Sequence, residues 1–251
     1  MGSSPGTTAA AKGRAKTTRR GGRDAVRLGE KELRPIKSGA KSVTKGTQTN
    51  NKRSKDVRKR ITTAALECFG AFGFEGTSTR AVAERAQVTH TLILYHFKSK
   101  EQLWLATMDE CLSAYEAEMA RHIRAALRKS AAAAVRTFIE RFIRVSAEKP
   151  EIHRILTMES NQGTSRLNWV IENYLRRHFE QMTAVIRQAQ QDGTVRQCDP
   201  ARLYYMIIGA CGTPFTISTE YKELTGRDVF SETEILRNIA FLYELIFVDE
   251  V

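Results

Sequence analysis

The sequence predicts an all-α protein, and three observations support this prediction. From residue 57 onward, apolar residues recur at intervals of three and four, the spacing that places them on one face of an α-helix. Residues that begin and end helices separate these segments. No stretch alternates apolar and polar residues between turn-forming residues, as a half-buried strand does. We expect about nine helices, without internal repeats, after an N-terminal segment of different composition.

The N-terminal segment, residues 1–52, is predicted to be a disordered basic extension. Through residue 60, eighteen Lys and Arg residues stand against four acidic ones, a net charge of +14. The remainder carries −2, since the formal charge of the whole chain is +12. Large apolar side chains are almost absent from the segment, so burial cannot offset the entropy cost of ordering it. Three interpretations of the segment remain open: a solvated tail weakly attracted to DNA, an arm that binds along the DNA backbone, and a transit peptide.

The rest of the composition indicates a cytoplasmic protein without metal or cofactor. The four cysteines have neither CxxC nor metal-ligand spacing, so we expect free thiols in a reducing compartment. The longest apolar run, residues 203–217, is shorter than a membrane span and is interrupted by two glycines and a proline. No signal peptide is recognisable, and no membrane partner is expected.

The first three helices follow from their apolar positions and caps. Apolar residues at helical spacing predict the first helix over residues 57–72, and two glycines, the first of them Gly73, end it. Ser78 is predicted to cap the second helix and Thr89 the third. The residues between these helices, 86–88, allow only a tight turn. This arrangement predicts a helix-turn-helix.

Longer helices are predicted for the rest of the chain. Ser99 and Gln102 form a capping box at the start of a fourth helix that reaches about residue 128. Pro150 and Pro200 suit the first turn of later helices, and Asp199 is predicted to cap the helix that Pro200 begins. Ser231 begins the last helix with a second capping box. The expected ranges after the fourth helix are 131–148, 150 to a break at 161–163, 164–191, 200–224 and 231 onward.

Residues 88–97 carry the strongest functional indication. Thr89, His90 and Thr91 lie at the N-terminal end of the third helix, where backbone N–H groups favour phosphate. Hydroxyl and imidazole groups at that position can reach base edges in a groove. Singly, each is more often a solvated or packed residue, but their joint occurrence predicts sequence-specific DNA binding. The predicted DNA-contacting residues are Arg80, Thr89, His90, Thr91, Tyr95, His96, Lys98 and Lys100.

These residues resemble the DNA-binding domain of the TetR family of bacterial transcriptional regulators over about fifty positions. The resemblance implies a three-helix domain followed by a helical domain that binds a small effector and forms a homodimer. More weakly, the later helices resemble the subgroup that includes the pyrimidine-utilisation regulator. The matching fragments of the DNA-binding part are Gly73-Phe74, Gly76-Thr77-Ser78, Val82-Ala83-Glu84-Arg85-Ala86, Val88-Thr89, Tyr95-His96-Phe97 and Ser99-Lys100-Glu101-Gln102-Leu103.

The chain departs from the family pattern at several positions. Gln87 replaces the usual glycine of the helix-turn-helix corner, which predicts a strained or reshaped corner. Leu94 replaces an aromatic residue that touches phosphate in many relatives, and His90 and Thr91 replace commoner residues, so the operator sequence is expected to differ. The pyrimidine-holding groups of the subgroup are largely absent, so a pyrimidine effector is not expected. The residues at or near the corresponding positions are Tyr115, Ile208, Cys211 and Gly212.

The sequence predicts three parts. Residues 1–52 are the extension, residues 53–104 the DNA-binding domain, and residues 105–251 the effector and dimerisation domain.

An effector pocket among helices is mostly apolar with a few polar groups, and plain core packing is the alternative for each candidate. The candidates are Trp104, Met108, Tyr115, Phe142, Met158, Trp169, Asn173, Cys211 and Phe215.

The last helix carries two apolar stripes, which suggests one face on its own domain and one on a second copy. A central position in a monomer is the alternative. The residues predicted for the dimer interface are Ile235, Ile239, Leu242, Tyr243 and Ile246.

The sequence therefore predicts a homodimeric DNA-binding regulator, most often a repressor, that a small molecule releases from double-stranded operator DNA. One alternative is a non-specific chromosome-binding protein that uses the basic extension. A helical enzyme is the other alternative. The chain has no nucleophile elbow, no HExxH and no phosphate-binding glycine loop, which argues against the enzyme.

Overall fold

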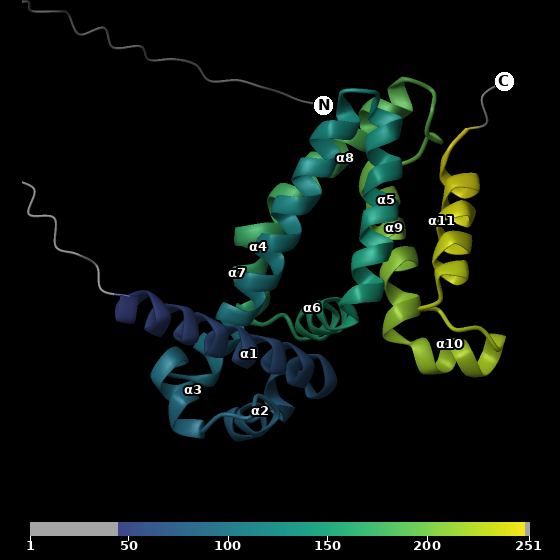
Figure 1. Ribbon diagram of the computed structural model, residues 1–251. Coiled ribbons are helices and arrows are strands. Elements are labelled where there is room, and N and C mark those ends of the chain that lie inside the picture. Colours follow the sequence, from purple (N-terminus) through teal and green to yellow (C-terminus); the bar gives the residue numbers. More distant parts are fainter. Residues whose placement is uncertain (1–44, 249–251) are drawn as a thin grey trace, which may run out of the picture. The chain divides into compact units, whose positions relative to one another are not determined.

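The computed structural model describes residues 45–248, with side chains from residue 53 (Figure 1). Most of the predicted extension, residues 1–44, lies outside this range. Helix α1 begins at Lys45, so the last residues of the segment predicted as an extension belong to this helix. Once a helix is nucleated by its packed part, each added residue gains a backbone hydrogen bond at little further cost.

The described residues form helices in the following order, with one π-helical turn, η1, joining two of them. The elements are α1 (Lys45–Gly76), α2 (Thr79–Arg85), α3 (His90–Phe97), α4 (Lys100–Leu127), α5 (Ala131–Glu148), α6 (Pro150–Gln162), α7 (Ser165–Val170), η1 (Ile171–Leu175), α8 (Arg176–Gln191), α9 (Pro200–Thr216), α10 (Ser218–Thr225) and α11 (Glu232–Ile246).

The predicted all-α fold is confirmed. Within residues 45–248 the β-structure is limited to an isolated bridge between Val195 and Phe247. The α7–η1–α8 stretch is one continuous helix, whereas the helix predicted over residues 200–224 is divided at Ile217, with φ −107° and ψ 31°. Pro214 lies one turn earlier, and its ring removes a backbone donor and crowds the helix. No helix in the described part is long and apolar enough to cross a membrane.

The helix caps predicted from the sequence are confirmed. Each cap side chain accepts a hydrogen bond from the backbone N–H three residues later, over 2.8 to 3.3 Å. These bonds satisfy N–H groups that have no partner within the helix. The cap residues are Ser78, Thr89, Ser99, Asp199 and Ser231.

The buried apolar residues form two clusters. The head cluster contains α1, α2, α3 and the first half of α4 as far as Leu112, with Ile155 of α6 and Val170 of α7. The body cluster contains the second half of α4 together with α5, α8, α9 and α11. Helix α4 runs unbroken through both clusters (Figure 1), so the proposed boundary at residue 104 falls inside a helix. We call the two parts the head and the body.

Candidate DNA-binding surface and effector pocket

Helix α3 is fixed to the head by its buried side. Ile93 and Phe97, one helical turn apart, are buried in the head cluster. The opposite side carries Thr91, Leu94 and Tyr95, and the Tyr95 side chain is 70% exposed. The sequence therefore gives α3 one anchored face and one accessible face, as a recognition helix requires.

The corner between α2 and α3 is strained, as the glycine replacement predicts. Gln87 has φ 53°, a left-handed conformation that costs a residue with a Cβ atom about 1–2 kcal/mol. The guanidinium of Arg60 in α1 donates hydrogen bonds to the carbonyls of Ala86, at 2.7 Å, and Gln87, at 3.1 Å. Arg60 therefore holds the corner from outside the motif.

A second left-handed residue separates α3 from α4. Lys98 has φ 66° and ψ −46°, and the N–H of Ser99 donates to the carbonyl of Phe97 at 2.7 Å. This is the geometry of a γ-turn with positive φ, a rare and strained turn. The turn places the Lys98 ammonium 5.7 Å from the centre of the Tyr95 ring, so a cation and an exposed aromatic lie together beside α3.

Three of the eight predicted DNA-contacting residues already bond within the protein. The Thr89 hydroxyl caps α3, and the Nε2 atom of His90 lies 2.9 Å from the hydroxyl of Thr79. The Lys100 ammonium donates to the carbonyl of Phe74 at 3.0 Å. Of the others His96 is half-buried, and the exposed ones are Arg80, Thr91, Tyr95 and Lys98.

A buried ion pair joins α6 to α7, the two helices whose Ile155 and Val170 pack into the head cluster. Arg166 of α7 lies 3.1 Å from Glu159 of α6, and their side chains are 11% and 4% exposed. The Arg166 guanidinium also lies 3.6 Å from the centre of the Phe74 ring, and the Lys100 ammonium lies 4.3 Å from it. Phe74 thus lies between a cation of α7 and a cation of α4.

Glycines allow α6 to approach both of its neighbours closely. A Cβ atom on Gly70 of α1 would lie 2.6 Å from Cβ of Glu151, and one on Gly212 of α9 would lie 2.5 Å from the ring of His153. Such distances are shorter than van der Waals contact allows. Helix α6 is therefore tightly packed between α1 of the head and α9 of the body.

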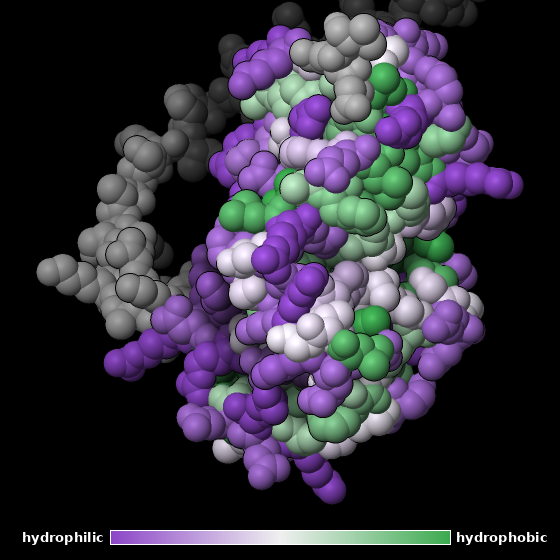
Figure 2. Space-filling view, turned by 90° about the vertical axis from the view of Figure 1, so that its right-hand side faces the viewer, coloured by the Kyte–Doolittle hydropathy of each residue, from purple (hydrophilic) through white to green (hydrophobic). Residues whose placement is uncertain are grey.

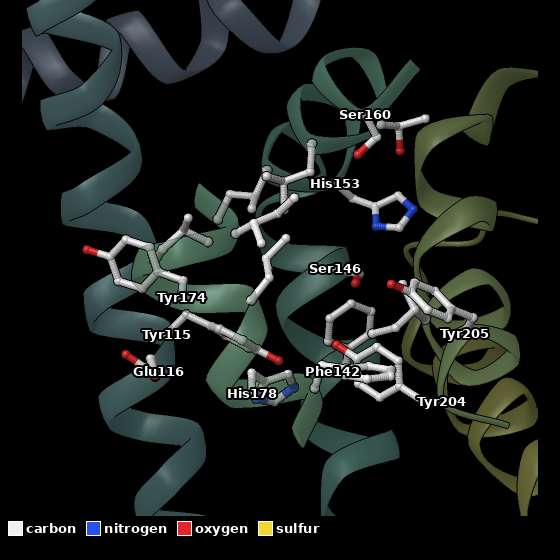
Figure 3. A pocket seen from close by; sticks show the side chains of 18 of the residues that line it. Tyr115, Glu116, Phe142, Ser146, His153, Ser160, Tyr174, His178, Tyr204 and Tyr205 are labelled. Atoms are coloured by element: carbon white, nitrogen blue, oxygen red, sulfur yellow. The ribbon is translucent and has the colours of Figure 1, made fainter. Parts of the chain in front are cut away.

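A cavity of about 580 Å³ lies where the head and body clusters meet (Figure 3). Its walls come from α4, α5, α6, the α7–η1–α8 helix and α9. The interior is mostly apolar, as expected of a small-molecule site. Residues that line it include Leu112, Tyr115, Phe142, Val145, Ser146, Ile152, His153, Leu156, Thr157, Ser160, Ile171, Tyr174, Leu175, His178, Phe179, Tyr204, Tyr205 and Ile208.

The titratable groups inside the cavity are held in their neutral forms. Burial raises the pKa of the Tyr115 hydroxyl well above its usual value, and it likewise raises the pKa of Tyr204. Burial lowers the pKa of His178 to about 4, despite the opposing effect of Glu116. His153 has its pKa lowered for the same reason, because an apolar environment disfavours the charged imidazole.

Two of the nine predicted effector residues, Tyr115 and Phe142, line this cavity. The other seven lie elsewhere, in the cores or on other surfaces. Asn173 is exposed, and Met158 lies beside α1, its sulfur 3.4 Å from where a Cβ on Gly73 would be. Those in or against the head cluster are Trp104, Met108 and Trp169, and those in the body cluster are Cys211 and Phe215.

The stripe of α11 predicted for the dimer interface faces the core of its own chain instead. Ile235, Ile239, Leu242 and Ile246 are buried in the body cluster of their own chain, and the half-buried Tyr243 donates its hydroxyl to the carbonyl of Arg136 at 3.1 Å. Both stripes of the helix are apolar, so the pattern could not tell which one faces inward. Of the second stripe, Leu236 and Ala240 are exposed and Phe247 is buried, and Phe241 and Leu245 are exposed as well.

Sequence reasoning missed the wall that α6 and the π-helical turn contribute. The turn at Ile171–Leu175 inserts one extra residue and so rotates the following helix by about 100°. The residue types of this stretch do not predict the π-helical turn. The missed residues include His153, His178, Tyr204 and Tyr205, and only their aromatic character was a usable signal.

Metal chemistry has no site in the described part of the chain. No three His, Cys, Asp or Glu side chains within it are grouped as metal ligands. The four cysteines are free thiols, as expected.

Two family models match the chain. Residues 61–107 match the model described as "Bacterial regulatory proteins, tetR family", and residues 132–246 match "Tetracyclin repressor-like, C-terminal domain". The chain is 30% identical to the HTH-type transcriptional regulator RutR of Escherichia coli (strain K12) over 196 residues, which cover 76% of this chain and 90% of RutR. This likeness confirms the family and subgroup resemblance predicted from the sequence.

Solved structures show the same fold at low identity. The ketosteroid transcriptional regulator KstR2 of Mycobacterium tuberculosis has a TM-score of 0.60 and 16% identity, over 76% of this chain and 95% of that one. AibR in complex with isovaleryl coenzyme A and operator DNA has a TM-score of 0.62 and 16% identity, over 76% of this chain and 98% of that one. The helix-turn-helix, the two matched family models and the likeness to RutR together show that this chain belongs to the TetR family of bacterial transcriptional regulators.

Proposed function

We propose that this TetR-family protein is a homodimeric repressor that a small molecule releases from operator DNA, with no catalytic role. The observation that carries the proposal is the position of the cavity. Two helices that wall it, α4 and α6, also pack against α1 of the head. A ligand in the cavity can therefore act on the part that reads DNA. Such a regulator works in the cytoplasm, with the bacterial chromosome.

On the DNA-binding surface, one set of residues binds phosphates and another contacts bases. Tyr95, Lys98 and Lys100 bind phosphates and determine affinity, since phosphate contacts carry no sequence information. Thr91 is exposed at the start of α3 and, with Thr89 and His90, contributes to base choice. The Lys100 ammonium has three N–H donors, so its bond to Phe74 leaves two for phosphate. Arg80 and His96 complete the surface.

The signal passes through α4 and α6 together. Helix α4 carries Tyr115 in the cavity wall and begins at the cap that follows α3. Helix α6 lines the cavity with His153 and Leu156 and packs on α1 through the close contact at Gly70. Two half-sites about 34 Å apart tolerate little change in the spacing of the heads, so a small tilt of these helices weakens binding.

Dimerisation uses the exposed apolar residues of α11. Leu236 is 50% exposed, Phe241 60% and Leu245 45%, and Figure 2, which faces this side, shows apolar residues interrupted by polar ones. Exposed apolar patches rimmed by polar residues mark protein interfaces. Replacing Leu236 and Leu245 with Glu should give a monomer by sedimentation, whereas a monomeric wild-type protein would contradict the dimer.

The relatives support both halves of the proposal. RutR is named as an HTH-type transcriptional regulator, and AibR was solved with both a coenzyme A ester and operator DNA. Small-molecule binding and operator binding therefore occur in a protein of this fold. The ligand of this chain does not follow from those names.

The decisive experiment is selection of genomic fragments that the full chain binds, followed by footprinting. A palindromic site with two half-sites about one DNA turn apart is expected. Thr91→Ala should change the preferred bases, whereas Lys98→Ala should weaken binding to all sequences alike and flatten the salt dependence by about one unit. Binding without a preferred site would instead establish the non-specific chromosome binder.

A further inference from the structure

Two buried polar atoms of the cavity have no hydrogen-bond partner among the described residues. They are the hydroxyl of Tyr115 on α4 and Nε2 of His178 on α8. Their rings lie 6.3 Å apart, centre to centre, and Figure 3 shows the Tyr115 hydroxyl directed toward His178. Buried polar groups are nearly always paired in folded proteins, so two unpaired ones in a single cavity call for an explanation.

The surroundings fix both rings without supplying a partner. Tyr115 lies edge-on to Phe142 at 6.2 Å. His178 lies 5.4 Å from Phe138 and 6.0 Å from the ring of Tyr204. Aromatic packing of this kind orients a side chain but does not satisfy its donor or acceptor. The two groups are therefore held ready for a partner that enters the cavity.

The π-helical turn brings His178 into this position. It precedes His178 by one helical turn, and Ile171, Tyr174 and Leu175 of the turn itself line the cavity. In an unbroken α-helix, His178 would be rotated by about 100° from its present direction. Such turns occur frequently at functional sites.

Four charged residues line the cavity, and two of them are paired. Glu116 bonds to Arg177 and Arg176 bonds to Glu172, whereas Lys149 and Glu180 are exposed to solvent. The imidazole of His178 is neutral in this environment. A carboxylate or phosphate placed between Tyr115 and His178 would thus be buried without a counter-charge, which is strongly unfavourable.

We infer that the cavity takes an uncharged, mainly apolar molecule whose single hydroxyl or carbonyl group bonds to Tyr115 and His178. A phenolic or imidazole group can donate or accept, so together they suit a hydroxyl, which does both. The volume of about 580 Å³ is that of a site for an effector of drug-like size. The inference rests on the proposed function of the cavity as the effector site.

Calorimetry with the full chain and four biphenyl derivatives tests the chemistry directly. The probes are 4-hydroxybiphenyl, biphenyl, biphenyl-4-carboxylate and biphenyl-4-trimethylammonium. We expect 4-hydroxybiphenyl to bind about tenfold more tightly than biphenyl, and both ions to bind more weakly than biphenyl. A carboxylate or ammonium that binds best, or no binding by any probe at about 1 mM, would overturn the inference.

Conservative variants test the two residues. Tyr115→Phe and His178→Phe should each lose about tenfold in affinity for 4-hydroxybiphenyl and keep their affinity for biphenyl. Tyr205→Phe, at a cavity residue that is 65% exposed, is the matched control and should change neither. Tyr115→Phe should unfold at the same or a higher temperature, because it removes a buried unpaired hydroxyl. Equal probe affinities in Tyr115→Phe and wild type would contradict the assignment.

The two proposals fail in distinguishable ways. If operator fragments are selected but the hydroxyl gives no advantage in binding, the inference about ligand chemistry fails alone. If the probes bind in the expected order but no specific DNA site is found, the chemistry stands and the proposed regulatory function fails.

Discussion

The polar groups of the head and those of the cavity differ in whether they have hydrogen-bond partners. In the head, Thr77 donates its hydroxyl to the carbonyls of Gly73 and Cys68, and Lys100 caps the carbonyl of Phe74. In the cavity, the Tyr115 hydroxyl and Nε2 of His178 have no partner in the described part of the chain. The head is complete before DNA arrives, whereas the cavity is completed by what it binds.

One atom of the head cluster departs from this contrast. Nε1 of Trp104 also has no partner in the described structure, and its ring lies 5.9 Å from the Arg166 guanidinium. Trp104 thus lies beside the ion pair between α6 and α7. The contrast between paired and unpaired polar groups can be tested by breaking each kind of contact.

The largest effect on stability is expected at the buried ion pair between Arg166 and Glu159. Arg166→Ala leaves Glu159 buried without its cation and should lower the free energy of unfolding by about 3–5 kcal/mol, as measured by urea denaturation. Adding Glu159→Gln should recover about half of that loss, because no buried charge then remains. A loss below about 1 kcal/mol for Arg166→Ala would mean that the pair does not stabilise the packing of α6 against α7.

The buried imidazole of the cavity should make stability depend on pH. The pKa of His178 is about 4 in the folded chain and about 6.5 when unfolded. Between these values the unfolded chain binds more protons, so stability present above pH ~6.5 is lost as the pH falls toward 4. The expected loss is about 3 kcal/mol at pH 4.

His178→Phe supplies the comparison, because it removes this titration. The variant should lose less stability over the same pH range, although His153, whose pKa is also lowered, still contributes. Urea midpoints measured from pH 7 to about pH 4.5 check this. Identical pH profiles for the variant and the wild type would show that His178 is not buried as described.

Adding a single methyl group at the close contact between α6 and α9 should lower the stability of the protein. Gly212→Ala places a Cβ atom 2.5 Å from the His153 ring and should cost about 2 kcal/mol through overpacking. In a His153→Ala background the same substitution should cost nothing, since the obstructing ring is gone. A penalty that persists in the double variant would place the cause outside this contact.

The smallest effect is expected at the strained corner of the head. Gln87→Gly relieves the left-handed conformation and should raise the free energy of unfolding by about 0.5–1 kcal/mol, because part of the gain is offset by the entropy of glycine when unfolded. Operator affinity should stay the same. A destabilised variant would show that the Gln87 side chain makes a contact worth more than the strain.

The head was predictable because its contacts are local. The caps at Ser78, Thr89 and Ser99 act within three residues, and Ile93 and Phe97 are one turn apart. The clamp by Arg60 on the corner was not predictable, because it joins residues 26 and 27 positions apart. Spacing rules describe one element at a time and do not extend to such pairs.

The cavity was largely unpredictable for the same physical reason. Its walls come from five helical stretches that are distant in sequence, and the π-helical turn before His178 changes the register without a signal in residue type. Tyr115 and Phe142 were identified, but equally apolar residues such as Met108 and Cys211 lie in plain core. On α11, two apolar stripes left the inward face undecided.

The central claim is that occupation of the cavity changes the affinity of the head for DNA. Thr157 and Gln162 are both exposed on α6, but only Thr157 lines the cavity. Thr157→Trp fills part of the cavity and should weaken binding to the selected operator about 10- to 100-fold, within the usual range of coupling energies. Gln162→Trp should leave the affinity unchanged. A folded, dimeric Thr157→Trp protein that binds the operator within about twofold of wild type would contradict the account.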